Sequence, residues 1–175
     1  MPTSQPDVIP LVVSQLIRAH PNTVLDIGCG WGKYGVLARE YLELWREDTS
    51  LERDVFIDAI EAHEPYIGLL HRAVYDNVHV GDALALLPTL PNYDYILLID
   101  VLEHFTKEEG NTLLDLCAVK GDKTLVVTPF KPRAQGASYG NEYETHRSKW
   151  SLSDFDRFAT THSMSSALVV EMGAK

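Results

Sequence analysis

The sequence predicts a three-layer α/β fold, in which helices cover both faces of a mostly parallel β-sheet. Short apolar runs alternate with amphipathic segments along the 175 residues. The run at 93–99 is almost entirely apolar, as expected of a strand that is buried on both faces. The first apolar run leads into a turn in which glycines alternate with other residues, at 28–35. At this length we expect a single domain over 1–175.

The first half of the chain starts with an N-terminal helical segment, 1–21, because apolar residues recur at helical spacing over 8–20. Pro21 and Asn22 end this helix. The next predicted elements are a strand over 23–27, a helix over 33–45, a charged loop over 46–54, a strand over 55–61 and a short helix over 65–75.

The second half continues the alternation. It predicts a strand over 78–80, a helix through 87, a strand over 93–99, a helix from Thr106 and a strand over 123–128. Thr106 with Glu109 has the pattern of a capping box, and Ser151 with Asp154 repeats it before a helix through 159. Only one convincing strand, 167–172, follows, so we expect a shortened C-terminal β-hairpin.

Composition narrows the class of protein. Lys and Arg total 15 and Asp and Glu total 25, which gives a net charge of −10 and argues against nucleic acid as the partner. Two cysteines without a disulfide framework fit reduced thiols. The first residues do not resemble a secretory signal, and no apolar run is long enough to span a membrane. We therefore expect a cytoplasmic protein without membrane contact.

Acidic residues near the ends of the predicted strands help to choose the ligand of the glycine turn. Residues 30–35 fit the pattern G-x-G-x-x-G, which binds dinucleotides through their pyrophosphate. However, Asp26 precedes the turn, and Glu61, Asp82 and Asp100 end or follow the next three strands. These carboxylates would repel phosphate and attract a ligand with an ammonium, a sulfonium and ribose hydroxyls. S-adenosylmethionine (SAM) has these groups and no phosphate.

At these residues the chain resembles the class I SAM-dependent methyltransferases, which have a Rossmann-like sheet. Asp26-Ile27-Gly28-Cys29-Gly30-Trp31-Gly32 is similar to the first motif of that family. The resemblance implies that SAM is bound by Asp26, Gly28, Cys29, Gly30, Gly32, Glu61, Asp82 and Asp100. Within this set, it implies that Glu61 accepts the ribose hydroxyls and that Asp82 meets the adenine amino group.

The acceptor side is expected around the residues that follow the fourth and fifth strands. Asp100-Val101-Leu102-Glu103-His104 resembles the family's motif beside the transferred methyl group. The long segment 130–150 begins at the same end of the sheet, and loops of this length often bind substrates. It contains His146 in a stretch similar to one in small prokaryotic methyltransferase-like proteins. The candidate catalytic residues are therefore Glu103, His104 and His146.

The sequence thus predicts an enzyme that moves a methyl group from SAM to an unidentified, small-molecule acceptor by in-line displacement. Alignment supplies much of the rate, and His104 or His146 would serve as general base for a hydroxyl. The acceptor and the oligomeric state stay open.

Three alternatives compete with this prediction. Glu103-His104 with a later histidine is also similar to metal-dependent 2′-O-methyltransferases that act on RNA ends, although Asp100 replaces a Glu of that group and the net charge suits RNA poorly. Whether a metal binds there stays open. A non-catalytic SAM-binding protein would be expected to have a damaged first motif, and this motif is intact. A nicotinamide-dependent oxidoreductase would need a second domain for its catalytic residues.

Overall fold

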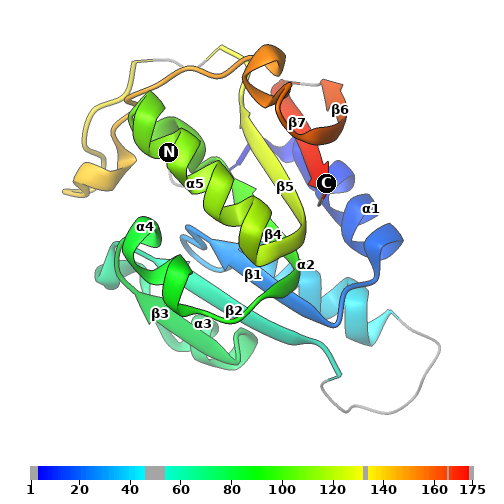
Figure 1. Ribbon diagram of the computed structural model, residues 1–175. Coiled ribbons are helices and arrows are strands. Elements are labelled where there is room, and N and C mark those ends of the chain that lie inside the picture. Colours follow the sequence, from blue (N-terminus) through cyan, green and yellow to red (C-terminus); the bar gives the residue numbers. More distant parts are fainter. Residues whose placement is uncertain (1–3, 46–53, 132–133, 165, 174–175) are drawn as a thin grey trace.

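A seven-stranded sheet with the order β3-β2-β1-β4-β5-β7-β6 forms the centre of the protein (Figure 1). The computed structural model describes residues 4–45, 54–131, 134–164 and 166–173, so residues 46–53 of the predicted charged loop lie outside it. The strands are β1 (Thr23–Ile27), β2 (Phe56–Glu61), β3 (Asn77–Val80), β4 (Tyr93–Ile99), β5 (Gly121–Pro129), β6 (Ala159–Met164) and β7 (Ala167–Gly173). The first five pair in parallel, and β7 lies antiparallel between β5 and β6.

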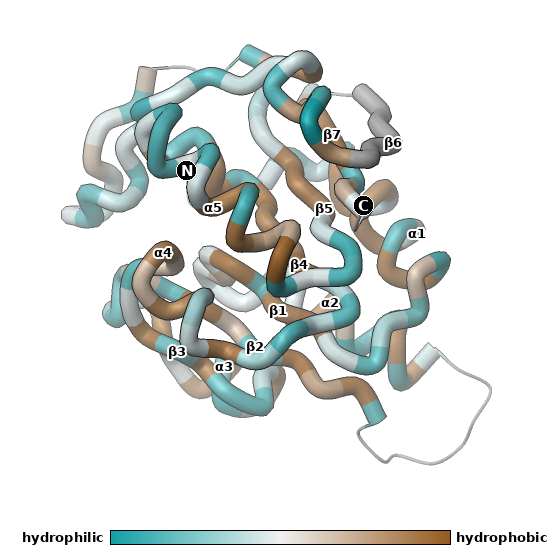
Figure 2. Tube along the Cα trace, in the orientation of Figure 1, coloured by the Kyte–Doolittle hydropathy of each residue, from teal (hydrophilic) through white to brown (hydrophobic). Residues whose placement is uncertain are grey.

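Helices lie on both faces of this sheet, as the sequence predicts (Figure 1). They are α1 (Ile9–Ala19), α2 (Lys33–Arg39), α3 (Leu69–Val74), α4 (Ala83–Leu86) and α5 (Lys107–Lys120). One hydrophobic cluster joins α1, α2 and α3 to one face, and a second joins α4 and α5 to the other. Leu97 belongs to the first cluster and its neighbour Leu98 to the second, because successive side chains of a strand point to opposite faces. Figure 2 shows the central strands as hydrophobic between these two layers.

The order of the strands predicts where a ligand would bind, at the carboxyl ends of β1 and β4. From β1 the chain adds β2 and β3 on one side, and it then returns to add β4 and β5 on the other side. The loops after β1 and β4 therefore leave the sheet in opposite directions. In open α/β sheets, ligands bind at the carboxyl ends of the strands where the order reverses in this way. The glycine turn lies at this point.

The C-terminal edge corrects the prediction of a shortened hairpin. β6 and β7 form a complete antiparallel pair, with Ala159 opposite Gly173 and Met164 opposite Leu168. β6 is an edge strand that pairs only with β7, and its sequence lacks the apolar alternation of a buried strand. The predicted helix before it is only a 3₁₀ turn, Leu152–Phe155. The capping box at its start is present, since the backbone N–H of Ser151 donates to Asp154 at 2.8 Å.

Two other helices differ from their predicted form. The segment predicted as one helix over 33–45 changes at Glu40 into a π-helical turn. The segment predicted as one helix over 65–75 consists of a 3₁₀ turn, Glu64–Tyr66, and the separate helix α3. The capping box at Thr106 is confirmed by its hydrogen bonds with Glu109. In the described part of the chain, no helix is both long enough and apolar enough for a membrane span.

Candidate functional site

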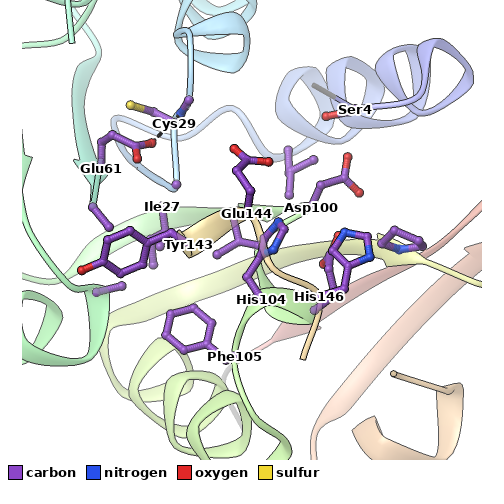
Figure 3. Close-up of a pocket in the computed structure, with 18 of the residues that line it drawn as sticks. Ser4, Ile27, Cys29, Glu61, Asp100, His104, Phe105, Tyr143, Glu144 and His146 are labelled. Carbon is purple, nitrogen blue, oxygen red and sulfur yellow. Dashed lines mark hydrogen bonds between the residues drawn. The ribbon is translucent and has the colours of Figure 1, made fainter. Parts of the chain in front are cut away.

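A cavity of about 680 Å³ opens at the carboxyl ends of β1, β2 and β4 (Figure 3). The turn after β1, Glu61 at the end of β2 and Asp100 after β4 line it. Residues of the segment 134–147 line it from the other side, and Ser4 lines it from the N-terminal segment. Most of the predicted site residues therefore meet in one space, although they come from segments far apart in the sequence.

The turn after β1 requires its glycines. Gly28, Gly30 and Gly32 have φ angles of 70°, 53° and 84°, which lie in the left-handed region that other residues rarely adopt. A Cβ atom on Gly28 would also overlap the Cγ2 atom of Val101. The turn is held to the sheet because the N–H of Gly28 donates to the carbonyl of Ile60 at 2.8 Å. Residues 28–31 of this turn line the cavity.

Glu61 faces the cavity from the end of β2, and its carboxylate is already oriented. Its Oε2 accepts the backbone N–H of Gly30 at 2.8 Å, and its Oε1 accepts the N–H of His63 at 2.8 Å. A carboxylate oxygen can accept a second hydrogen bond, so both oxygens keep acceptor capacity. Burial raises the pKa of Glu61, and the two N–H donors oppose this shift. The arrangement suits a ligand that presents two neighbouring hydroxyl groups.

Asp26 lies beneath the glycine turn instead of in the wall of the cavity. Its carboxylate is 2% exposed and accepts a hydrogen bond of 2.6 Å from the hydroxyl of Tyr75. Burial raises the pKa of Asp26 to about 7, and the bond from Tyr75 opposes the shift. Sequence reasoning selected Asp26 but did not find its partner. The side chain of Asp26 therefore does not line the cavity, and its predicted role in SAM binding stays a prediction.

Asp26→Asn is expected to stabilise the protein near pH 7.5, by about 1–2 kcal/mol, and to have little effect near pH 4. The folded-state pKa of about 7 exceeds the usual aspartate pKa of 3.8, which applies to the unfolded chain. Between these values the unfolded chain binds fewer protons than the folded protein, so the free energy of unfolding falls as pH rises. Asparagine removes this loss because it carries no charge.

Urea unfolding of both proteins at the two pH values measures the difference. Asp122→Asn, at an exposed position, is the control. A destabilisation by Asp26→Asn at the higher pH, or an effect that does not change with pH, would contradict the expected result.

The remaining predicted SAM-binding residues have mixed surroundings. Asp82 lines the cavity, but its Oδ1 also accepts the N–H of Leu84 at 2.7 Å and so caps α4. Asp100 lines the cavity with a left-handed φ of 52°, and burial raises its pKa while Ser4 and Lys33 oppose the shift. Cys29 is buried, and burial raises the pKa of its thiol, which excludes a reactive thiolate. The role of each in SAM binding stays a prediction.

The three predicted catalytic residues come together. His104 and His146 lie at the end of the cavity away from Glu61 (Figure 3). Glu103 and His104 belong to the 3₁₀ turn after β4, Leu102–His104. The rings of His104 and His146 lie 5.1 Å apart, although 41 residues separate them in the chain. One donor atom from each of Glu103, His104 and His146 lies within 4.8 Å of the other two, a spacing that could hold a metal ion.

The protonation of this group follows from its contacts. The Nδ1 atom of His104 lies 3.2 Å from the carbonyl of Thr145, which can only accept a hydrogen bond. Nδ1 therefore carries the proton, and Nε2 keeps its lone pair. Burial lowers the pKa of His104 to about 4, so the ring is neutral at neutral pH. Burial and the charge of Asp100 raise the pKa of Glu103 to about 8, and Thr128 donates to its carboxylate at 3.1 Å.

The segment 134–150 is tied to the turn after β4. The N–H groups of Arg147 and Ser148 both donate to the backbone carbonyl of Glu103, at 2.8 and 3.1 Å. The indole N–H of Trp150 lies 3.3 Å from the carbonyl of Leu102, and Trp150 is buried. These bonds place His146 beside His104.

Within the same segment, Asn141, Tyr143 and His146 line the cavity. Tyr139 is exposed and does not line it.

Three residues at the site have no signal in the sequence. Tyr66 donates to the carboxylate of Glu144 at 3.1 Å, and this bond joins the 3₁₀ turn after β2 to the segment 134–147. Tyr75 holds Asp26. The elements of Tyr66, Tyr75 and Glu144 were predicted only as a helix and a loop, and none of the three belongs to a motif. Only the tertiary structure brings these pairs together.

No protein-family model matches the sequence, and a comparison with curated proteins finds no match. Solved structures do share the fold. The N-terminal domain of EvdMO1, determined in the presence of SAH and D-fucose, has a TM-score of 0.68 and 13% identity over 99% of this chain and 85% of its own.

Two further structures have the same fold. Magnesium protoporphyrin IX methyltransferase (ChlM) from Synechocystis PCC 6803 with bound SAM has a TM-score of 0.64 and 17% identity over 97% of this chain and 79% of its own. TehB from Haemophilus influenzae has a TM-score of 0.68 and 13% identity over 98% of this chain and 64% of its own. The Rossmann-like methyltransferase fold predicted from the sequence is therefore confirmed.

Proposed function

We propose that this protein transfers a methyl group from SAM to a hydroxyl group of a small molecule. The observation that carries the proposal is the division of one cavity into two chemically different ends (Figure 3). A glycine turn and an oriented carboxylate form one end, and two neighbouring imidazole rings form the other. Solved structures of the same fold contain SAM or SAH, which supports the choice of cofactor.

The first end fits SAM. Gly28, Cys29 and Gly30 line the cavity, and the oriented oxygens of Glu61 suit two ribose hydroxyls. The carboxylates of Asp26 and Asp100 favour the positive charges of the ligand. When bound, SAM supplies an activated methyl group on a positively charged sulfur.

The second end would orient the acceptor and receive its proton. We assign the proton of the acceptor hydroxyl to His146, which lies in the cavity wall beside Asp100. His104 is neutral and offers the lone pair of Nε2 as a hydrogen-bond acceptor. Phe105 adds apolar surface to the wall near His104, and Tyr143 adds it on the side of Glu61, which helps to exclude water (Figure 3). Alignment and proton removal are the two contributions that this chemistry requires.

A small acceptor fits the site better than a nucleic acid. The net charge is −10, and the cavity wall carries Glu61, Asp82, Asp100 and Glu144 beside Lys33, Lys131 and Arg147. The overall negative charge disfavours a polyanion. Of the structures that share the fold, one was determined in the presence of D-fucose and one is a magnesium protoporphyrin IX methyltransferase, and both compounds are small molecules.

Calorimetric titration of the folded protein with SAM tests the proposal. We expect a dissociation constant on the order of 10 μM for SAM and no binding of NAD, because the acidic wall disfavours a pyrophosphate. Methyl transfer from SAM to a panel of hydroxylated small molecules then tests catalysis. Absence of SAM binding by the folded protein would refute the proposal, and binding without transfer to any acceptor would favour a non-catalytic SAM-binding protein.

A second candidate is a metal-dependent methyltransferase, and the clustering of Glu103, His104 and His146 favours it. The residues fit a divalent cation chemically, because they offer one carboxylate and two imidazoles. The bond from His104 Nδ1 to the carbonyl of Thr145 resembles the outer contact that orients metal-binding histidines. A cation there would bind the acceptor's oxygen and lower its pKa. The two candidate functions differ in one measurable property, the requirement for a metal ion.

A further inference from the structure

His71 connects α3 to the glycine turn. This residue lies in the middle of α3 and is 2% exposed. Its Nδ1 lies 3.1 Å from the backbone nitrogen of Gly68, just before the helix. Its Nε2 lies 2.8 Å from the backbone carbonyl oxygen of Gly30, which is 41 residues away in the sequence. A buried histidine therefore bridges the start of its own helix and the centre of the cofactor turn.

These two contacts decide which ring nitrogen carries the proton. A backbone N–H can only donate, so Nδ1 must accept from Gly68. A carbonyl oxygen can only accept, so the proton of the neutral ring lies on Nε2 and is donated to Gly30. Both ring nitrogens of His71 therefore form hydrogen bonds: Nδ1 accepts one from Gly68, and Nε2 donates one to Gly30.

Gly30 is consequently held on both sides of its backbone. Its N–H donates to the carboxylate of Glu61, and its carbonyl accepts from His71. Its φ of 53° lies in the left-handed region, and glycine there would otherwise sample many conformations. The two bonds keep the turn in one conformation before any ligand arrives, which reduces the entropy lost on binding.

We propose that His71 is a positioning residue for SAM, which presets the glycine turn through the carbonyl of Gly30. This inference rests on the proposed function. Tyr75, at the end of the same helix, supports the turn in parallel, because its hydroxyl donates to Asp26 and its ring packs where a Cβ atom on Gly35 would lie. The rings of His71 and Tyr75 are stacked, with centroids 6.0 Å apart. Together the two side chains form a floor under the turn.

The alternative is that His71 serves only α3, by accepting the N–H of Gly68. Two substitutions separate these roles. Asparagine places its side-chain oxygen near the position of Nδ1, so His71→Asn keeps the bond from Gly68 and loses the bond to Gly30. Glutamine places its amide nitrogen near the position of Nε2, so His71→Gln keeps the bond to Gly30 and loses the bond from Gly68.

We expect His71→Asn to weaken SAM binding by about threefold to tenfold, the effect of one lost hydrogen bond, and His71→Gln to stay within about twofold of the wild type. Calorimetric titration with SAM measures both. Hydrogen–deuterium exchange of the free proteins provides a readout that needs no ligand: exchange at 28–35 should be faster in His71→Asn than in His71→Gln. Thermal unfolding identifies a variant that fails to fold.

The outcomes are distinguishable. Weaker binding with faster exchange in His71→Asn alone would support the positioning role. The opposite order, with His71→Gln the more impaired variant, would show a role in α3 only and would overturn the inference. Equal behaviour of both variants and the wild type would also overturn it. If the wild type itself does not bind SAM, the proposed function fails, and the exchange data alone then decide whether His71 holds the turn.

Discussion

Glu61→Ala is expected to weaken SAM binding by about 100-fold or more, because it removes two charge-assisted hydrogen bonds, each of about 1.5–3 kcal/mol. Both carboxylate oxygens of Glu61 are oriented by backbone N–H groups, from Gly30 and His63, so they are presented to the ligand without further reorganisation. The substitution also leaves these two donors without their partner. The loss therefore affects both the ligand contact and the shape of the glycine turn.

Calorimetric titration measures this loss, and two variants calibrate it. Glu61→Gln keeps the volume and one acceptor oxygen, so a smaller loss of about tenfold is expected. Glu64→Gln changes an exposed carboxylate three residues away and should bind SAM as the wild type does. Thermal unfolding shows that each variant is folded. An unchanged affinity in folded Glu61→Ala would remove Glu61 from the SAM site.

His146→Ala is expected to lower kcat by about 100-fold or more while the affinity for SAM changes by less than about threefold, because general-base catalysis contributes roughly 10²–10⁴ to the rate. His146 lies beside His104, at the end of the cavity away from Glu61 (Figure 3). Its loss should therefore impair proton removal and leave the cofactor contacts in place. The measurement is methyl transfer to an acceptor found by screening, with a parallel SAM titration.

Glu142→Ala is the matched control, because it removes an exposed side chain from the same segment that does not line the cavity. Unchanged turnover in His146→Ala would exclude His146 from the reaction.

A chelator distinguishes the two candidate functions in the same assay. If His146 acts as a base, the wild type should keep its turnover in EDTA. If turnover is lost in EDTA and returns with Mn²⁺, the group of Glu103, His104 and His146 binds a metal and the second candidate function is favoured.

The fold could be predicted from the sequence where a strand is buried on both faces along its length. The strand predicted over 93–99 agrees with β4 residue for residue, because a strand covered by helices on both faces is mostly apolar. The predicted strand over 23–27 agrees with β1 for the same reason. β6 was missed because an edge strand has one partner and no buried pattern is imposed on its sequence. The 3₁₀ turn at 152–155 was predicted as a longer helix, because a capping box marks where a helix begins and does not determine its length.

The candidate site could be predicted from the sequence only in part. The glycines and the acids near the strand ends could be selected because parallel strands bring their carboxyl ends to one edge of the sheet. The positions of these residues at the strand ends do not predict the direction in which each side chain points. The side chain of Asp26 points beneath the glycine turn, where it accepts a hydrogen bond from Tyr75. The side chain of Glu61 faces the cavity. The bonds from His71 to Gly30 and from Tyr66 to Glu144 join segments 41 and 78 residues apart, and local sequence carries no information on such pairs.

The sequence by itself determined the layered α/β fold and the glycine turn. It also determined which groups could bind SAM and which could accept a proton. These follow from local patterns of apolar residues, from backbone angles that only glycine adopts readily, and from the chemistry of side chains. The tertiary structure alone decided which of those groups share one cavity, which are buried, and hence which are charged. It did so because distance and desolvation, which set the protonation of Asp26, Glu103 and His104, arise only when distant segments pack together.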